Sequence, residues 1–367
     1  MDEYRSFSTV ERSLMARASA AKKPVSGSME LLPLCNMNCK MCYVRLSPGE
    51  MKRQGKLRSW EEWLEAGRQM QQSGVLFLLL TGGEPLLFPE FRKLYLELRK
   101  LGFVLTINTN GTLIDEAWAD FFAKYKPRRI NITLYGASRE SYGDLCGYPQ
   151  GFERVLNAVR MLRQRKVDVK LSASVTPENV RDLEKMFAIA RELDVPLGVD
   201  TYMMPATRER ELPLGMQFRL GPEEAARARV DAMKLEWPDN FRDYAEKMIQ
   251  EADNFVPEST EPRSVTCHAG NCSFSVNWQG QLHPCVILTE PSANVFERGF
   301  QGAWEHLVKE MAPIRLHPDC SVCNLRGLCR TCAAAGLLEG GSYDAKPEYM
   351  CRYAGETLRL LREEVYG

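Results

Sequence analysis

Three cysteines near the N-terminus have a spacing that suits a metal centre. Cys35, Cys39 and Cys42 form a C-x3-C-x2-C run. The run supplies three thiolates rather than four, so zinc would keep an open position and a [4Fe–4S] cube would keep one iron without a protein ligand. That open iron could bind a substrate or cofactor. The spacing favours an iron–sulfur cluster over part of a zinc site or three buried structural cysteines.

A glycine-rich motif follows about 40 residues later, Thr81-Gly82-Gly83-Glu84-Pro85. Two glycines allow a close backbone approach and expose amide and carbonyl groups to a ligand. A buried Glu84 could accept a hydrogen bond from a cationic amine. A plain turn would explain the motif by itself. Its position after the cysteine run, again at a strand's C-terminal end, instead predicts one shared site.

Eight further cysteines gather toward the C-terminus. They are Cys267, Cys272, Cys285, Cys320, Cys323, Cys329, Cys332 and Cys351. Eight thiolates suit two four-ligand sites, of zinc or of iron and sulfur. Because the chain is long and lacks an export signal, metal binding is favoured over disulfides. Only Cys146 stands alone, and we interpret it as an ordinary thiol or, less simply, as a substrate-facing group.

Six short apolar runs must position the first two motifs. They are Met29–Leu34, Val75–Leu80, Phe103–Thr109, Arg129–Leu134, Val167–Val175 and Val195–Thr201. Amphipathic segments lie between them, one of them capped by Ser59 before Trp60. Strands alternating with helices predict a parallel sheet with right-handed crossovers, doubly wound or curled into a barrel. Because we interpret the strands as apolar throughout, we expect both faces of the sheet to be covered.

The alternation stops after residue 201. Met203–Pro222 is predicted to be a loop whose Arg208–Glu211 run forms a solvated face or, alternatively, contacts a peptide or a cofactor carboxylate. Helices are predicted at Pro222–Leu235 and Asn240–Asp253, and a last one at Tyr353–Tyr366. The predicted organisation is a polar extension (1–28), an α/β unit (29–220), a helical bridge (221–265) and a loop-rich cysteine domain (266–367).

Composition limits the partners. The 367 residues are 44% hydrophobic and 26% charged, and Lys+Arg and Asp+Glu balance at 48 each. A neutral chain lacks the basic field of a general nucleic-acid or membrane-surface binder. Its first 28 residues are polar, and no apolar run approaches a membrane span. We therefore expect a cytoplasmic protein with no nucleic-acid and no membrane partner.

Residues from about 29 to 201 resemble the radical S-adenosylmethionine (SAM) superfamily. The resemblance rests on the C-x3-C-x2-C run, on Gly82-Gly83-Glu84-Pro85, on Asn108-Thr109-Asn110-Gly111 and on Thr133-Leu134-Tyr135-Gly136. It implies a partial (β/α)6 barrel in which Cys35, Cys39 and Cys42 hold a [4Fe–4S] cluster. The amino and carboxylate groups of SAM would chelate the unique iron. One electron would then cleave SAM to a 5′-deoxyadenosyl radical, which abstracts a hydrogen from the substrate.

The same resemblance implies individual SAM contacts. The SAM amine would lie against Gly82, Gly83, Glu84 and Pro85, the ribose near Thr133, and a further contact would come from Asn108. Met41 stands where an aromatic residue often touches adenine, and the fourth-strand motif departs from Ser-Leu-Asp-Gly. The sequence assigns no catalytic acid or base.

Residues from about Thr266 to Tyr353 resemble the SPASM extension of this superfamily. That resemblance implies two auxiliary [4Fe–4S] clusters with interleaved ligands, and hence SAM and three [4Fe–4S] clusters in all. The first auxiliary cluster would be held by Cys267, Cys272, Cys285 and Cys332, and the second by Cys320, Cys323, Cys329 and Cys351. Two residues separate Cys329 from Cys332 in this chain, whereas three residues are common at this place in SPASM sequences. Full cysteine ligation points to electron transfer.

The resemblance implies an enzyme that modifies a peptide or protein. Our first hypothesis is a maturase that introduces a thioether or carbon–carbon cross-link into a ribosomally made peptide. It would use an external flavodoxin- or ferredoxin-type reductant and could use a separate leader-binding protein. A sulfatase-maturating, formylglycine-forming enzyme usually has Asp after the third auxiliary cysteine, where this chain has Val286. We also consider a small-molecule dehydrogenase and, from a different class, a non-enzymatic zinc or iron–sulfur protein that carries electrons.

Overall fold

A nine-stranded sheet organises the computed structural model, which describes residues 8–205, 208, 218–329 and 332–367. The strands are β1 (Ser26–Glu30), β2 (Phe77–Thr81), β3 (Val104–Thr109), β4 (Arg129–Thr133), β5 (Val169–Ser174), β6 (Leu197–Asp200), β7 (Ser273–Val276), β8 (Gln281–His283) and β9 (Ala293–Asn294).

Helices connect and cover these strands. The first part of the chain contains α1 (Thr9–Ala20), α2 (Pro48–Gln54), α3 (Trp60–Gln72), α4 (Phe91–Lys100), α5 (Glu116–Lys124), α6 (Arg139–Cys146), α7 (Gly151–Gln164) and α8 (Leu183–Glu192), with short 3-10 turns η2 (Pro85–Leu87) and η3 (Val180–Asp182). The later part contains α9 (Pro222–Glu236), α10 (Phe241–Asp253), α11 (Val295–Met311), α12 (Asp319–Val322), η5 (Asn324–Gly327), α13 (Ala333–Gly340) and α14 (Glu348–Tyr366).

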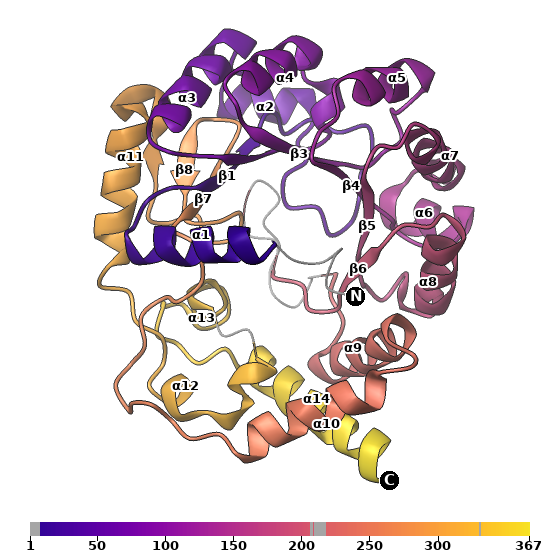
Figure 1. Ribbon diagram of the computed structural model, residues 1–367, viewed down its shortest axis with the longest axis vertical. Helices are drawn as coiled ribbons and strands as arrows, with labels where there is room; N and C mark the ends of the chain where they lie inside the picture. Colours follow the sequence, from indigo (N-terminus) through magenta and orange to yellow (C-terminus); the bar gives the residue numbers. More distant parts are fainter. Residues whose placement is uncertain (1–7, 206–207, 209–217, 330–331) are drawn as a thin grey trace.

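The first six strands are parallel neighbours in chain order, from β1 to β6. They curve into an arc with the helices on its outer side, as Figure 1 shows. This arrangement confirms the predicted parallel sheet with helical crossovers and the partial barrel. It also brings the C-terminal ends of all six strands to one rim, where the sequence motifs begin.

The strands alternate in burial, which corrects the expectation that both faces are covered. In β3, β4 and β5, residues such as Leu105, Ile107 and Ile130 are buried, while every second residue is half-exposed. The half-exposed positions include Thr106, Asn108, Asn131, Thr133, Ser172 and Ser174. The apolar residues pack under the helices, and the polar ones line the concave face, where they are partly exposed.

Local signals explain many of the helix boundaries. The Ser59 hydroxyl accepts a hydrogen bond from the N–H of Glu62, and the N–H of Ser59 donates to the Glu62 carboxylate. The predicted cap is therefore a complete capping box. The same reciprocal bonds begin α1 and α2. Within the described residues, no helix is long and apolar enough to cross a membrane.

The first strand lies earlier than predicted. β1 spans Ser26–Glu30 rather than Met29–Leu34. Its small residues fit between neighbours on both sides, because a Cβ on Gly27 would come 2.2 Å from the ring of Phe274 in β7. The apolar Leu31 and Leu32 are fully buried but belong to the loop after the strand.

The cysteine-rich region contributes to the same sheet. β7 pairs in parallel with β1, and β8 and β9 continue antiparallel from it. The predicted boundary at residue 266 therefore divides a continuous sheet. Helix α14 begins at Glu348, five residues before its predicted start, and packs along α9 and α10.

Candidate functional site

The cysteine loop and the glycine motif are joined backbone to backbone. The N–H of Gly83 donates to the carbonyl of Leu32 at 2.7 Å, and the N–H of Glu84 donates to Leu34 at 2.9 Å. A Cβ on Gly83 would lie 2.3 Å from the carbonyl oxygen of Leu34, and Gly82 has a positive φ of 153°. The two glycines are therefore required for the close approach between the glycine motif and the loop after β1 that carries Cys35.

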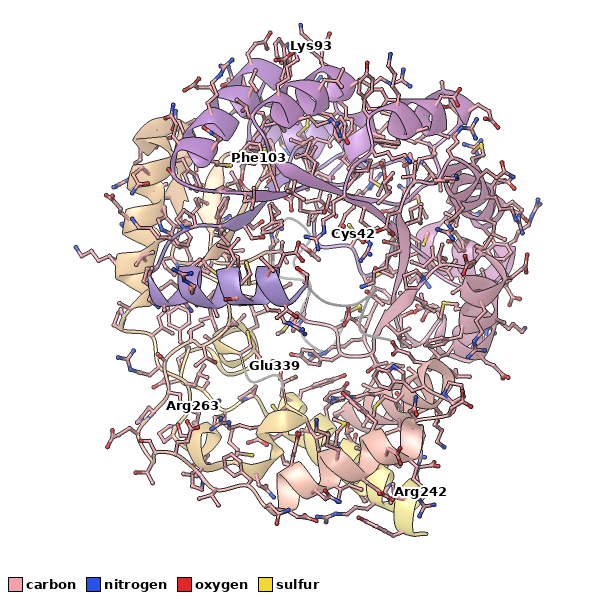
Figure 2. All side chains as sticks on the ribbon, viewed as in Figure 1. Cys42, Lys93, Phe103, Arg242, Arg263 and Glu339 are labelled. Atoms are coloured by element: carbon pink, nitrogen blue, oxygen red, sulfur yellow. The ribbon has the colours of Figure 1, made fainter. Side chains whose placement is uncertain are left out.

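The three N-terminal thiols form one group. Cys35 lies within electrostatic range of Cys39 and Cys42, and Cys42 is inside the arc of strands in Figure 2. The N–H of Met37 donates to Cys35 Sγ at 3.4 Å, and the N–H of Arg45 donates to Cys42 Sγ at 3.3 Å. Burial raises the pKa of the Cys35 thiol to about 12, so metal binding here must release protons.

The donor set suits an iron–sulfur cluster. Cys35, Cys39 and Cys42 supply three thiols from one short loop, and thiolates are the usual protein ligands of such clusters. The backbone N–H groups aimed at sulfur are of the kind that tunes iron–sulfur clusters. The residues present therefore fit a [4Fe–4S] cluster.

Glu84 is an internal anchor of the rim. Its fully buried carboxylate accepts from the N–H of Leu86 at 3.1 Å, the Thr109 hydroxyl at 2.7 Å and the N–H of Asn110 at 2.8 Å. Burial raises the pKa of Glu84 to about 7 although these hydrogen bonds oppose the rise. The carboxylate thus connects the ends of β2 and β3, and Pro85 begins the turn η2.

Asn110, rather than Asn108, lies against the cysteines. Its Nδ2 donates to Asn36 Oδ1 at 2.9 Å and is 3.6 Å from Cys35 Sγ. Asn108 lies on the concave face, where its Oδ1 accepts from Asn131 Nδ2 at 2.8 Å. Both residues belong to the Asn-Thr-Asn-Gly motif, but only the position of Asn110, one residue after β3, allows this contact.

The two other predicted SAM contacts lie near this rim. Thr133 ends β4, half-exposed and opposite Ser172. Met41 lies between two of the cysteines in the chain and packs, partly buried, on the main apolar core. SAM contacts of these two residues remain predictions.

Cys146 lies beside this group, although it is 104 residues away from Cys42 in the chain. Its fully buried thiol lies within hydrogen-bonding range of the Cys39 side chain. Burial, followed by this contact and the other nearby thiols, raises the pKa of Cys146. Its carbonyl accepts from the N–H of Asn38 at 3.0 Å, and that of Leu145 accepts from Lys40 at 2.9 Å. The C-terminal end of α6 therefore supports the cysteine loop.

Seven of the eight later cysteines interact electrostatically in two sets, and the place of Cys323 in the second set stays a prediction. Cys267 is within electrostatic range of Cys272, Cys285 and Cys332. Cys351 is within electrostatic range of Cys320 and Cys329. Cys332 therefore interacts with Cys285 and Cys267, although Cys329 is only three residues away in sequence. Burial raises the pKa of Cys332 and raises that of Cys351 to about 11.

A buried ion pair contradicts the expectation of a solvated run at residues 208–211. Both terminal nitrogens of Arg208 donate to the Glu30 carboxylate, at 2.8 and 3.0 Å, and the two side chains are 5% and 3% exposed. The guanidinium also lies 5.3 Å from the ring of Tyr43. Residues 209–211 lie outside the described residues. An Arg in a polar loop gives no sequence signal for such a partner.

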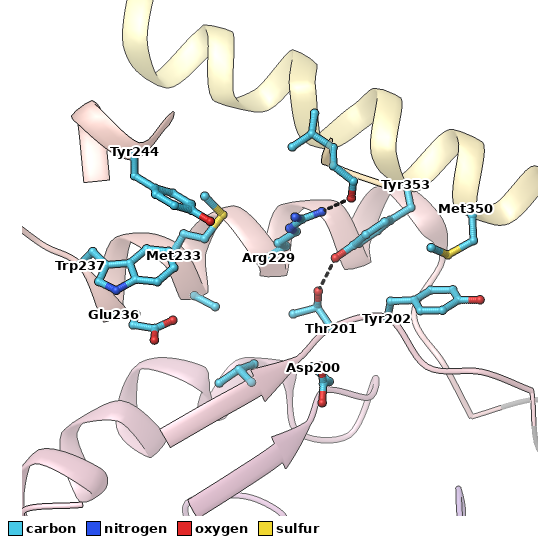
Figure 3. Close-up of a pocket in the computed structure, with 13 residues that line it drawn as sticks. Asp200, Thr201, Tyr202, Arg229, Met233, Glu236, Trp237, Tyr244, Met350 and Tyr353 are labelled. Carbon is cyan, nitrogen blue, oxygen red and sulfur yellow. Dashed lines mark hydrogen bonds between the residues drawn. The ribbon is translucent and has the colours of Figure 1, made fainter. Parts of the chain in front are cut away.

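A pocket of about 150 Å³ lies between the end of β6 and helices α9, α10 and α14 (Figure 3). Thr201 and Tyr353 share a hydrogen bond of 3.0 Å across it, and Arg229 donates to the carbonyl of Leu328 at 2.8 Å. The residues described as lining it include none of the predicted SAM or cluster residues. The pocket marks where the helical bridge joins the barrel.

Comparisons with known proteins agree with this geometry. Residues 29–190 match the model of the radical SAM superfamily, whose members bind SAM and a [4Fe–4S] cluster. An AdoMet-dependent heme synthase of Methanosarcina barkeri is 24% identical over 88% of this chain and 95% of its own length. The antilisterial bacteriocin subtilosin biosynthesis protein AlbA of Bacillus subtilis is 22% identical over 86% of this chain and 68% of its own.

Among solved structures, Streptococcus suis SuiB bound to the precursor peptide SuiA superposes with a TM-score of 0.67 at 17% identity, over 94% of this chain and 82% of that one. This likeness concerns the fold, which extends through the cysteine-rich region. The three thiols at the rim, the glycine motif that supports them and the match over residues 29–190 lead to one conclusion: residues 29–190 form a radical SAM domain, and the protein is an enzyme.

Proposed function

We propose that this enzyme is a peptide maturase of the SPASM type, which oxidatively cross-links a ribosomally made peptide through a thioether or carbon–carbon bond. Cys35, Cys39 and Cys42 would hold the [4Fe–4S] cluster that binds SAM. The two C-terminal groups would each hold an auxiliary [4Fe–4S] cluster, which brings the total to three. When bound, SAM and its cluster supply the 5′-deoxyadenosyl radical that abstracts a substrate hydrogen.

The separation of the later cysteines into two groups carries the proposal. Each group supplies only thiolates, and a cluster with four cysteine ligands has no vacancy for substrate. Such clusters are suited to electron transfer. Cross-linking removes two hydrogens in total from the peptide, so after the first hydrogen is abstracted a second electron and a proton must leave. The first group, around Cys267 and Cys332, lies next to the barrel through β7 and β8 and is suited to take that electron.

The concave face suits a peptide as the substrate. It presents alternating amides and hydroxyls, among them Asn108, Asn131 and Ser172. Such groups can donate to and accept from a peptide backbone. The fold relative SuiB is bound to a precursor peptide, and the sequence relative AlbA is named for the biosynthesis of a bacteriocin. A flavodoxin- or ferredoxin-type reductant would supply the first electron, and leader recognition could come from a separate protein.

Tetrapyrrole modification is a second candidate. The AdoMet-dependent heme synthase of Methanosarcina barkeri aligns with this chain over 95% of the synthase's own length. An iron-porphyrin substrate would need a broad apolar surface and cations for its carboxylates. The polar concave face favours a peptide substrate. The alignment with nearly the whole heme synthase favours a porphyrin substrate.

Anaerobic incubation with SAM, reductant and each substrate class separates these candidates. Peptides encoded beside the gene are expected to lose the mass of two hydrogens with an intact backbone, because cross-linking is a two-electron oxidation. An iron porphyrin supplied in parallel should remain unchanged in mass and absorbance. Porphyrin turnover with unchanged peptides would overturn the proposal in favour of the second candidate, and formylglycine at Cys or Ser would identify the sulfatase-maturating type.

The matched control is the variant in which Cys35, Cys39 and Cys42 are all alanine. It should retain the auxiliary clusters, because their ligands lie elsewhere, yet release no 5′-deoxyadenosine. Near-stoichiometric zinc in the wild type and no SAM cleavage would instead indicate a non-enzymatic metal protein.

A further inference from the structure

Cys146 is the one cysteine of the twelve that the proposed clusters do not use, since three, four and four ligands account for eleven. The structure nevertheless places its thiol against Cys39. The group around the SAM-binding position therefore contains four thiols, of which three have the spacing of cluster ligands. The fourth comes from the end of α6.

The surroundings hold Cys146 in place. Its side chain is fully buried, and Tyr135 is close enough to interact electrostatically with Cys39 and Cys146 together. The Cys146 and Leu145 carbonyls accept from the N–H groups of Asn38 and Lys40, on either side of Cys39. These two bonds fix the backbone of Cys39 relative to that of Cys146. The contact between the sulfurs is therefore supported by the main chain and not by side-chain packing alone.

We propose that Cys146 is a positioning residue that donates its S–H hydrogen to the sulfur of Cys39 and thereby raises the reduction potential of the SAM-binding cluster. This inference rests on the proposed cluster at Cys35, Cys39 and Cys42. Reduction adds electron density to the cluster and its ligand sulfurs, so a donor at a ligand sulfur stabilises the reduced form more than the oxidised form. Hydrogen bonds to sulfur are a recognised means of setting cluster potentials.

The first test uses the unmodified enzyme. If eleven cysteines ligate iron as thiolates, Cys146 carries the only S–H group, and the infrared spectrum should contain a single thiol stretching band. A hydrogen bond to Cys39 lowers the frequency of that band below that of a free thiol in an apolar solvent. Cys146→Ser should abolish the band and so assign it. A band at the free-thiol frequency would overturn the proposal.

The second test compares wild type and Cys146→Ala by redox titration followed with electron paramagnetic resonance. Losing the donor should lower the reduced-to-oxidised ratio of the SAM-binding cluster about threefold to tenfold at a fixed solution potential, where tenfold corresponds to about 59 mV for one electron. The auxiliary clusters, whose ligands are remote from Cys146, should titrate unchanged and serve as internal references.

The outcomes distinguish three cases. A purely structural role for Cys146 would reduce iron content or thermal stability and leave the potential of the loaded cluster unchanged, and that result would refute the inference. If Cys146→Ala failed to load the cluster, the frequency of the thiol band in the wild type would decide whether Cys146 donates to Cys39. A lowered frequency would support the inference, and the free-thiol frequency would refute it. A wild type that binds no cluster at Cys35, Cys39 and Cys42 would refute the proposed function itself.

Discussion

Arg208 holds the carboxylate of Glu30 with two hydrogen bonds, at 2.8 and 3.0 Å, in a place where both side chains are almost completely buried. Glu30 ends β1, and Arg208 lies eight residues after the end of β6, so the pair links the C-terminal end of β1 to the chain that follows β6. Two parallel charge-assisted bonds give the contact a defined geometry. The pair therefore connects these two parts of the barrel by side chains, since β1 pairs with β2 and β7 and not with β6.

Breaking this pair should be costly. Arg208→Ala leaves the Glu30 carboxylate buried without its cation, and the expected loss of stability is about 3–5 kcal/mol. Thermal unfolding should show a clear fall in midpoint. The matched control is Arg352→Ala, whose partner Glu223 is nearly half exposed, and here the loss should be about 1 kcal/mol or less. Equal midpoints for the two variants would contradict the importance of the buried pair.

The approach of Gly83 to Leu34 should limit cluster assembly. Gly83→Ala would place a Cβ 2.3 Å from a backbone oxygen, so the loop that carries Cys35 must move. We expect the purified variant to lack the iron of the SAM-binding cluster while it keeps that of the auxiliary sites, as measured by iron analysis and Mössbauer spectroscopy. Gly302→Ala in α11, where the new Cβ meets nothing closer than 3.8 Å, should keep all the iron. Full iron in both variants would refute the steric explanation.

The raised pKa of Glu84 should make the stability of the folded protein depend on pH. Its pKa is about 7 in the folded protein and 4.5 in the reference state, because burial disfavours the charge. Between these values the folded protein binds the proton more tightly than the unfolded chain, so stability falls as pH rises from about 4.5 to 7 and is level above that. The whole change amounts to about 3 kcal/mol.

The check is a comparison of thermal midpoints of wild type and Glu84→Gln from pH 5 to 8. The variant cannot titrate at this position, so the difference between the two should change with pH below 7 and stay constant above it. Glu90→Gln on the surface is the control and should follow the wild type. Parallel curves for wild type and Glu84→Gln would exclude the raised pKa.

Two neighbouring cysteines should affect different clusters. Cys332 groups with Cys267 and Cys285, whereas Cys329 is paired electrostatically with Cys351. Cys332→Ala is therefore expected to change the spectrum of the first auxiliary cluster and Cys329→Ala that of the second. Mössbauer spectra of each variant against the wild type would show this. The same spectral change in both variants would mean that the two residues share a cluster.

Much of the fold is predictable from the sequence because periodicity is a local property. Strands β2 to β6 lie within two residues of their predicted starts, and the capping box at Ser59 begins α3 as expected. The order of apolar and amphipathic segments is enough for a parallel sheet. The prediction for β1 is wrong because its Ser-Gly-Ser sequence has no apolar pattern, and its strand is defined by pairing with β2 and β7.

The polar face of the barrel is also absent from the prediction, although a signal for it exists. Thr106 and Asn108, or Ser172 and Ser174, alternate with apolar residues in the sequence. The strands look apolar throughout because the buried half of the pattern is the stronger half. Alternation of period two indicates one covered and one open face.

The amino-acid sequence alone specifies the chemical groups: three closely spaced cysteines, a glycine motif and eight later cysteines, because ligand spacing within a loop is a local matter. Which distant groups meet is settled only in three dimensions. Folding brings Cys146 to Cys39, Asn110 to Cys35, Arg208 to Glu30 and Cys332 to Cys267. Those contacts form between loops that follow different strands, so they depend on how the strands are arranged in the folded protein. The residue pattern within one segment of the chain does not encode that arrangement.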